Sequence, residues 1–350
     1  LDTLMEKYPD LEVTYTLGLA GKEYTADTTS VDLSALPPTE ILAAAETLGR
    51  MPELANVELM TAAGTSPLSL SDVQTLVDAA PQASFHYTFT LFDKTISTND
   101  TQVAFKNLSL TEADIPALRS ALGVMTDCTA FILDNCGLSS EQMAQIRADY
   151  PRTELVWRIK FGKYSAMTNA ETIRAVYNVF DDTSSELQYC WRVKYMDIGH
   201  NETLTDLSFV GSMPELEILI ASGCAVKELT GFENCKKLEF LELAYCYKLE
   251  NIDALAGCEN LKNLNICYSK VSSLKALDGL PLEQFMCKQT RVPAAEQKVF
   301  KEIHPKCVTN FYGKEPYAGA GWRYVDNGKT YTEIYKKVRE VFGYDDMPQS

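Results

Sequence analysis

The sequence lacks the features of a membrane-spanning or nucleic-acid-binding protein. Its apolar runs fall well short of the roughly 18 residues that a membrane-spanning helix needs. Basic residues are scarce, because 32 Lys and Arg stand against 48 Asp and Glu and give a formal net charge of −16. Such a chain repels phosphate backbones and anionic lipid head groups, so nucleic acids and membrane surfaces are not expected partners.

Motifs for metals and phosphates are also missing. Ten cysteines occur without a CxxC pair or a His/Cys cluster of zinc spacing, so we expect no metal and no cofactor. The segment with Gly18, Gly21 and Lys22 comes nearest to a phosphate-binding loop, but it does not match GxxxxGK[ST]. An initiator methionine is absent at Leu1, which suggests that an export signal or an expression tag has been removed.

One pattern, LxxLxLxxN, returns five times between Val193 and Thr290. Its copies begin at Val193, Leu216, Leu238, Leu261 and Leu282, so the period is nearly constant. A fixed period of about 20–29 residues with this spacing is typical of leucine-rich repeats, in which each repeat supplies a short strand and a return segment. The pattern positions are Val193, Met196, Ile198, Asn201; Leu216, Leu219, Ala221, Cys224; Leu238, Leu241, Leu243, Cys246; Leu261, Leu264, Ile266, Ser269; and Leu282, Phe285, Cys287, Thr290.

A longer repeat precedes this array, and Pro9, Pro81 and Pro151 mark equivalent positions in its three copies. Each copy continues into a strand of alternating polarity and a turn that ends in lysine, which predicts three β-hairpin arms. The aligned positions are Leu4, Tyr8, Pro9 and Val13; Leu76, Ala80, Pro81 and Phe85; and Ile146, Tyr150, Pro151 and Leu155, with turn lysines Lys22, Lys94 and Lys163.

Helix and strand signals separate the predicted arms. A helix is expected near Thr39 to Arg50, and further helices have N-terminal caps with capping-box spacing or a capping threonine. Residues 169–186 match neither earlier copy, so we expect a change of solenoid geometry there. The predicted caps are Ser71 with Gln74, Thr111, and Ser139 with Gln142, and the predicted strands are Val57 to Leu59 and Phe131 to Leu133.

The segment after Thr290 is expected to close the end of the repeat array. It contains a predicted helix at Pro293 to Ile303, a strand at Cys307 to Tyr312 and an amphipathic helix capped by Thr330 with Glu333. A cap is the simplest role for that last helix, and binding to a partner is the alternative.

The predicted fold is an α/β right-handed leucine-rich repeat solenoid with a curved parallel sheet, hairpin arms in the N-terminal half and a helical C-terminal cap. Its right-handed sense follows from the rule for parallel strands joined by crossovers. Residues 1–192 are expected to form irregular helix-bearing long repeats, residues 193–292 the regular repeats, and residues 293–350 the cap. All three parts are expected to belong to one continuous solenoid.

Most of the cysteines take up apolar or small positions of the repeat. Cys224 and Cys246 stand where other repeats carry Asn, Ser or Thr, and Cys287 fills an apolar slot. Buried packing explains these positions. Cross-linking of Cys128 with Cys136, or of neighbouring repeat cysteines, stays open at this point.

Several of these residues resemble the leucine-rich repeat superfamily. Asp197 to Asn201 (DIGHN), Leu238 to Leu243 (LEFLEL) and Gly321 to Tyr324 (GWRY), together with the hairpin arms, are similar to exported repeat proteins of anaerobic gut Firmicutes. The resemblance covers nearly the whole chain. It implies a curved α/β solenoid, export and a non-catalytic binding role, and it supplies no catalytic residues.

The candidate site is the concave face of the sheet, because the residues between the core leucines of each strand point to that face. Apolar side chains surrounded by polar ones are typical of interaction surfaces. Tyr245 and Tyr268 occupy equivalent positions and should stack on adjacent repeats, where mutual packing competes with binding of a sugar or an aromatic side chain. The candidate residues are Tyr195, Asp197, Ile218, Ile220, Phe240, Glu242, Asn263, Asn265, Tyr245 and Tyr268.

Catalysis has little support in the sequence. Asp197 and Glu242 lie two repeats apart, about 10 Å, which is near the upper limit for a pair of glycosidase carboxylates. An open sheet also excludes no water. We therefore expect a non-enzymatic, extracellular or cell-surface recognition module that binds a protein or peptide. The alternatives are an envelope scaffold whose concave face is covered by its own C-terminal segment, and a glycan-binding protein.

Overall fold

The computed structural model describes Lys7 and residues 15–317, 321–325 and 330–344. The chain divides into two compact units, Leu1–Trp157 and Arg158–Ser350. The predicted positions Leu4, Tyr8, Pro9 and Val13 lie outside the described residues.

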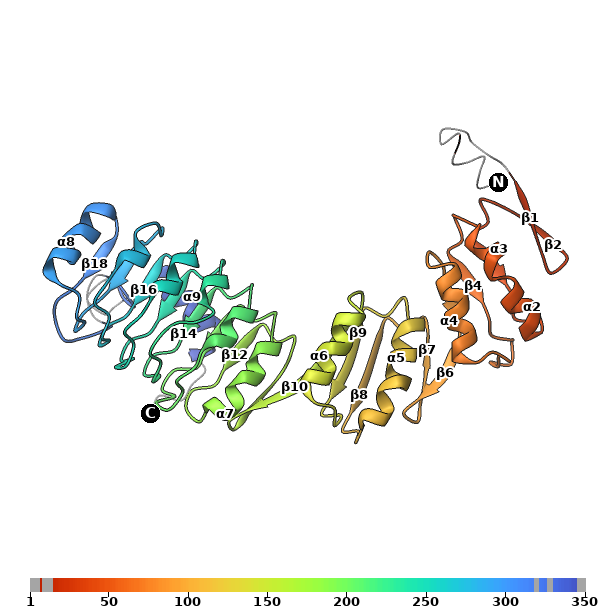
Figure 1. Ribbon diagram of the computed structural model, residues 1–350, viewed down its shortest axis with the longest axis horizontal. Helices are drawn as coiled ribbons and strands as arrows, with labels where there is room; N and C mark the ends of the chain where they lie inside the picture. Colours follow the sequence, from red (N-terminus) through yellow and green to blue (C-terminus); the bar gives the residue numbers. More distant parts are fainter. Residues whose placement is uncertain (1–6, 8–14, 318–320, 326–329, 345–350) are drawn as a thin grey trace. The chain divides into compact units, whose positions relative to one another are not determined.

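The N-terminal unit is built from short parallel strands preceded by antiparallel hairpins (Figure 1). The hairpins β1–β2 and β6–β7 begin at Thr16 and Thr88, an offset equal to that between Pro9 and Pro81 in the long repeat. One parallel set is β3–β4–β5, and in the other β8 and β9 pair with residues 154–157 of β10. The strands are β1 (Thr16–Leu19), β2 (Lys22–Thr25), β3 (Ser30–Asp32), β4 (Asn56–Glu58), β5 (Ser84–His86), β6 (Thr88–Leu91), β7 (Lys94–Ser97), β8 (Gln102–Lys106), β9 (Ala130–Asp134) and β10 (Glu154–Phe161).

Helices return the chain between these strands. The capping box predicted at Ser139 with Gln142 is confirmed, since each side chain bonds the backbone amide of the other. The box predicted at Ser71 with Gln74 is wrong, because Ser69 and Asp72 form it and the helix begins earlier, at Leu70. The helix predicted over Thr39 to Arg50 is two short helices. The helices are α2 (Pro38–Ala43), α3 (Ala45–Gly49), α4 (Leu70–Ala79), η1 (Glu112–Asp114), α5 (Ile115–Val124) and α6 (Ser140–Asp149).

The C-terminal unit contains one parallel sheet of seven described strands (Figure 1). Five of them, β13 to β17, are the centres of the five predicted repeats, and their core residues Leu219, Leu241 and Leu264 are in register and completely buried. Residues 158–161 of β10 form a hairpin with β11 before the sheet. The strands are β11 (Tyr164–Met167), β12 (Thr172–Arg174), β13 (Tyr195–Asp197), β14 (Ile218–Ile220), β15 (Phe240–Glu242), β16 (Asn263–Asn265), β17 (Gln284–Met286) and β18 (Val308–Asn310).

Short turns of 3-10 helix replace the longer helices in this unit, so each repeat is shorter. After β13, β14 and β15 a side chain donates to a backbone carbonyl of the preceding repeat. Asn201 Nδ2 donates to the carbonyls of Ala175 and Ile198, at 3.0 and 2.7 Å. The return segments are α7 (Asp181–Ser184), η2 (Ser185–Tyr189), η3 (Ser208–Ser212), η4 (Phe232–Asn234), η5 (Asp253–Gly257) and η6 (Lys275–Leu277).

The cysteines follow the same repeat. Cys224 and Cys246 place their sulfurs 3.4 and 3.3 Å from the carbonyl oxygens of Ile198 and Ala221, in the position that Asn201 fills in the first repeat. The ten cysteines all lie among the described residues and form no disulfide, and nine of them are buried. Burial raises the pKa of Cys246 to about 12. The packing interpretation is therefore confirmed, and no disulfide links Cys128 to Cys136.

Of the last three described elements of the chain, only helix α9 lies on a different part of the sheet from the one that the sequence predicts. Helix α8 (Ala294–Ile303) and strand β18 lie where the sequence predicts a last helix and a last strand, and β18 extends the sheet by pairing in parallel with β17. Helix α9 (Glu333–Val341) instead packs on the concave face of the sheet, so the expected end cap is corrected to a face cover. Its N-terminal cap is Thr332, whose hydroxyl accepts from the amide of Tyr335, and not the predicted Thr330.

Candidate functional site

The C-terminal segment, which the structure describes at residues 312–317, 321–325 and 330–344, covers much of the predicted site. Ile218 and Phe240 are completely buried, and the indole of Trp322 stacks on the Phe240 ring at 4.9 Å between centroids. Tyr335, Val338 and Phe342 from the region of α9 complete this apolar cluster. The expectation of an exposed apolar patch is therefore corrected, because the chain supplies its own apolar partner for these side chains.

Glu242 anchors this cover. Its carboxylate is 1% exposed. Trp322 Nε1 donates to Oε2 at 2.7 Å, while Ser222 Oγ and Arg323 Nη2 donate to Oε1 at 3.1 and 3.4 Å. A buried charge is tolerated only when it is paired and hydrogen-bonded, and Glu242 meets that condition through the C-terminal segment.

Asp197 makes a second anchor two strands away. Its Oδ1 accepts from the amide of Gly199 at 3.0 Å, and its Oδ2 accepts from the hydroxyl of Tyr344 at 2.6 Å. Burial raises the pKa of Asp197, although these hydrogen bonds and the nearby Arg174 oppose the rise. Internal donors therefore occupy both carboxylates that the sequence offered as a catalytic pair.

Successive backbone carbonyls of residues 313–316 are bound by side chains of the sheet. The four donors come from two adjacent repeats at the C-terminal end of the array, so this segment lies on the concave face as an extended peptide would. The pairs are Gln289 Nε2 to Gly313 O (3.0 Å), Tyr268 Oη to Lys314 O (2.7 Å), Lys288 Nζ to Glu315 O (2.9 Å) and Asn265 Nδ2 to Pro316 O (3.1 Å).

A cavity of about 680 Å³ remains open beside this cover, over the first strands of the sheet. Its lining includes Asp197, Ile220 and Glu242 from the predicted set. The C-terminal segment contributes Tyr317, Tyr335 and Tyr344 among others, so sheet and cover build the cavity together. We call it the β12–β15 pocket. Its cationic residues are Arg174, Arg323 and Arg339.

The pairing of strands β13 to β17 identifies the kind of repeat that forms the array. Each strand carries one centre of the LxL type, and neighbouring centres pair in parallel without a shift. After three of the strands, Asn201, Cys224 and Cys246 donate to a carbonyl of the preceding repeat. The chain has the leucine-rich repeat fold. The strand register and the hydrogen bonds between successive repeats of this chain support that fold.

Comparisons with known proteins give distant similarities to other leucine-rich repeat structures. No protein-family profile matches the sequence, and no curated protein matches it. An internalin of Listeria monocytogenes is 16% identical over 78% of this chain and 82% of its own, with a TM-score of 0.37. A leucine-rich repeat protein of Leptospira interrogans is 12% identical over 80% and 81%, also with a TM-score of 0.37. The functional domain of another Listeria internalin, which includes a cysteine ladder, is 12% identical over 83% and 69%, with a TM-score of 0.35.

A row of residues with left-handed backbone follows the strands of the leucine-rich repeat array. His200, Tyr245, Tyr268 and Gln289 have φ between 56° and 63°, and Gly223 has φ 77°. Tyr245 and Tyr268 stack at 4.9 Å between ring centroids, which confirms the mutual packing predicted from their spacing. Tyr177 stacks on His200 at 5.3 Å and is 55% exposed. This second pair lines the β12–β15 pocket.

Of the candidate residues Tyr195, Asn263 and Asn265, the first and the last contact the C-terminal segment. Tyr195 faces the ammonium of Lys337, which lies 5.1 Å from its ring centroid. Asn263 and Asn265 are buried, and the Oδ1 of Asn265 accepts from the amide of Cys267 at 3.0 Å. Tyr195 through Lys337 and Asn265 through the Pro316 carbonyl therefore serve the docking of the C-terminal segment, and none of the three residues lines the pocket.

Sequence reasoning missed the arginines of the pocket. Arg174 follows the period of the regular repeats, since Thr172 to Arg174 pairs in register with Tyr195 to Asp197. Extending the regular period back by one repeat would have placed Arg174 beside Asp197. Arg323 and Arg339 had no such signal, because they reach the sheet from a segment far beyond Glu242 in the sequence.

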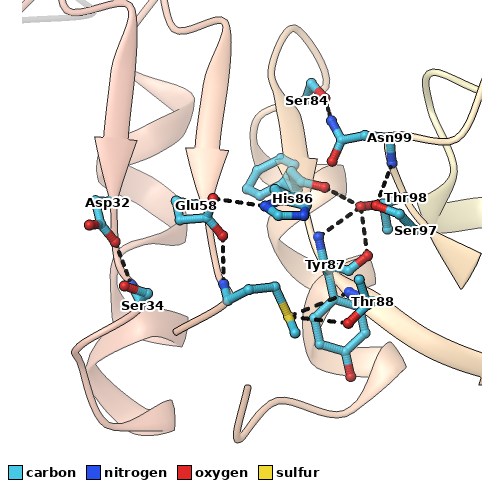
Figure 2. Close-up of polar contacts among 12 residues, drawn as sticks. Asp32, Ser34, Glu58, Ser84, His86, Tyr87, Thr88, Ser97, Thr98 and Asn99 are labelled. Carbon is cyan, nitrogen blue, oxygen red and sulfur yellow. Dashed lines mark hydrogen bonds and ion pairs between the residues drawn. The ribbon is translucent and has the colours of Figure 1, made fainter. Parts of the chain in front are cut away.

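A second polar row lies in the N-terminal unit (Figure 2). Asp32, Glu58 and His86 stand in register on β3, β4 and β5, and His86 Nδ1 lies 2.8 Å from Glu58 Oε2. The carboxylates also accept from backbone amides slightly later in the chain, Ser34 at 2.9 Å and Met60 at 2.8 Å. These contacts cap the strand ends, so we assign the row a structural role.

Within the described ranges, no group of three His, Cys, Asp or Glu side chains is arranged to hold a metal ion. None of the helices in the described part of the chain combines the length and the hydropathy that a bilayer crossing needs.

Proposed function

We propose that the C-terminal unit is a non-enzymatic recognition module for a peptide segment of another protein, and that the β12–β15 pocket is its binding site. The observation that carries this proposal is the docking of residues 313–316, whose four carbonyls are each bound by a side chain of the sheet. A sheet face whose side chains already bind the carbonyls of one extended segment can bind a second extended peptide by the same kind of hydrogen bond. Peptide main chain offers the same carbonyl acceptors whatever its sequence.

The β12–β15 pocket begins where residues 313–316 end. Tyr317 follows directly after the four bound carbonyls, contacts Tyr245 edge to face at 6.1 Å, and lines the pocket. Beyond it, the Tyr177 and His200 pair offers an accessible aromatic surface. Aromatic residues beside polar groups are common at the centres of binding sites.

A non-enzymatic role agrees with the state of the two carboxylates. Asp197 and Glu242 are 3% and 1% exposed, and internal donors hold both oxygens of each. A general acid or base must reach the proton that it transfers. Neither group meets that need while the C-terminal segment is docked.

The scaffold hypothesis is the second candidate, and the covered concave face favours it. Under that hypothesis the C-terminal segment serves only to stabilise the array, and the pocket has no ligand. Extracellular or surface location belongs to our proposal in either case, and the sequence resemblance is its support. Fractionation of the native cells tests it directly.

The experiment is selection of displayed random hexapeptides on the immobilised full-length protein. We expect enrichment of a defined set and at least a tenfold loss of affinity in the double variant Tyr177→Ala, His200→Ala. Tyr312→Ala is the matched control, because Tyr312 is 73% exposed and does not line the pocket. Absence of any enriched peptide would favour the scaffold. Phe240 and Glu242, two of the candidate residues from the sequence, are unsuitable for substitution because they anchor the C-terminal segment on the sheet.

A further inference from the structure

We propose that the β12–β15 pocket selects a single carboxylate on the bound peptide. This inference rests on the proposed function and specifies the ligand of the same site. Arg174 on β12, Arg323 before the last helix and Arg339 on α9 line the pocket, together with Asp197 and Glu242. The charges of these groups sum to one positive charge, in a chain whose formal net charge is −16. His200 adds to that charge only when it is protonated.

The acidic residues do not offer their charge to a ligand. Glu242 is bonded by Trp322, Ser222 and Arg323, and Asp197 by Gly199 and Tyr344. Both are nearly inaccessible, whereas the Arg323 side chain is 28% exposed and the Arg174 side chain 36%. The surface that a ligand meets is therefore cationic.

The guanidinium of Arg323 has hydrogen-bond donors that the described residues do not fully pair. Its guanidinium lies 3.8 Å from the ring centroid of Tyr317 and 5.1 Å from that of Tyr335, so two aromatic rings hold its position. It reaches Glu242 through Nη2 at the long distance of 3.4 Å. Its Nε is buried and has no hydrogen-bond partner among the described residues. Buried donors are almost always paired, so the donors of this guanidinium are only partly used by the described residues.

The charge balance favours a carboxylate over a phosphate. One carboxylate neutralises the single surplus charge, whereas a phosphate near its second ionisation would leave a net negative charge in a half-enclosed site. Arginine binds planar carboxylates through paired N–H donors, which suits the geometry of its fork. Repulsion from distant acidic residues is weak, because charges more than about 8 Å away are screened at physiological salt.

A peptide offers this carboxylate from two sources, an acidic side chain or its own C-terminus, and the experiment separates them. Fluorescence polarisation is measured on the full-length protein with four pools of labelled random hexapeptides. One pool has a free C-terminus and no acidic residue, one has a C-terminal amide and one Glu, one has Gln in place of that Glu, and one has phosphoserine there. We expect the first or the second pool to bind at least tenfold more tightly than the Gln pool.

The variant Arg339→Gln should reduce this preference to less than threefold. Lys336→Gln is the matched control on the same helix, since Lys336 pairs with Glu333 and does not line the pocket. Arg323→Lys is the second variant, and hydrogen exchange in α9 shows whether its cover stays docked. If all four pools bind equally, the carboxylate inference is wrong and the peptide-binding function stands. If the phosphoserine pool binds most tightly, a dianion is the ligand and the inference is also wrong. Failure of every pool to bind would reject the proposed function itself.

Discussion

The hydrogen bond from Trp322 to Glu242 is expected to hold the C-terminal segment on the sheet, and Trp322→Phe tests it. The bond is 2.7 Å long, its acceptor is a carboxylate, and both side chains are buried. Phenylalanine keeps an aromatic ring against Phe240 but has no N–H. Loss of a hydrogen bond to a charged group weakens a structure by about 1.5–3 kcal/mol. The opening equilibrium of the cover should therefore rise roughly 10- to 100-fold.

Hydrogen exchange measured by mass spectrometry on the full-length protein is the assay. Amides of α9 should exchange roughly 10- to 100-fold faster in the variant, while those of β16 and β17 keep the wild-type rate. Trp157→Phe is the matched control, because it removes a bond from Trp157 Nε1 to the neutral hydroxyl of Ser140 in the N-terminal unit. Exchange in α9 within threefold of wild type would refute the assignment of Glu242 as an anchor.

Three further predictions concern the rest of the C-terminal unit. Gly257→Ala should destabilise the protein by about 1–3 kcal/mol in urea denaturation, because its added Cβ would lie 2.5 Å from the carbonyl oxygen of Glu233, whereas Gly279→Ala meets no atom within 4 Å and should change little. Ellman's reagent should modify at most one thiol of the native protein, that of the partly exposed Cys307, because the other nine are buried. After denaturation it should modify all ten. The pKa of Asp197 is raised by burial, so the native state binds this proton more tightly than the unfolded state and its contribution to stability should increase as the pH falls from neutral toward 3.8. Asp197→Asn should remove that pH dependence, and equal slopes in both proteins would contradict it.

The repeat array was predictable because its core is periodic. Leu219, Leu241 and Leu264 fill equivalent places, so a spacing read from the sequence specifies both the strands and their pairing. The same logic identified Cys224 and Cys246 as packing residues. Helix starts were less certain: Ser69 and Ser71 both precede the same apolar period, and only the backbone distinguishes which of them caps the helix.

The cover and the pocket were not predictable in the same way. Helix α9 has an apolar side formed by residues such as Tyr335 and Val338, and that pattern is the same whether the helix closes an end or lies on a face. Its actual partner depends on Glu242 meeting Trp322, which is distant in the sequence. Contacts at such separations leave no local signal, so the sequence indicated which residues share the concave face but left open whether the C-terminal segment covers it.

The left-handed row after the strands implies a trade-off between stability and recognition. Non-glycine residues in this conformation carry a strain of about 1 kcal/mol each, and glycine relieves it. Only Gly223 takes that option among the five aligned repeats, while His200, Tyr245, Tyr268 and Gln289 keep side chains that stack or bind carbonyl oxygens. A thermostability screen should therefore recover glycine at these positions, and each such gain should loosen the segment or the ligand that the lost side chain holds.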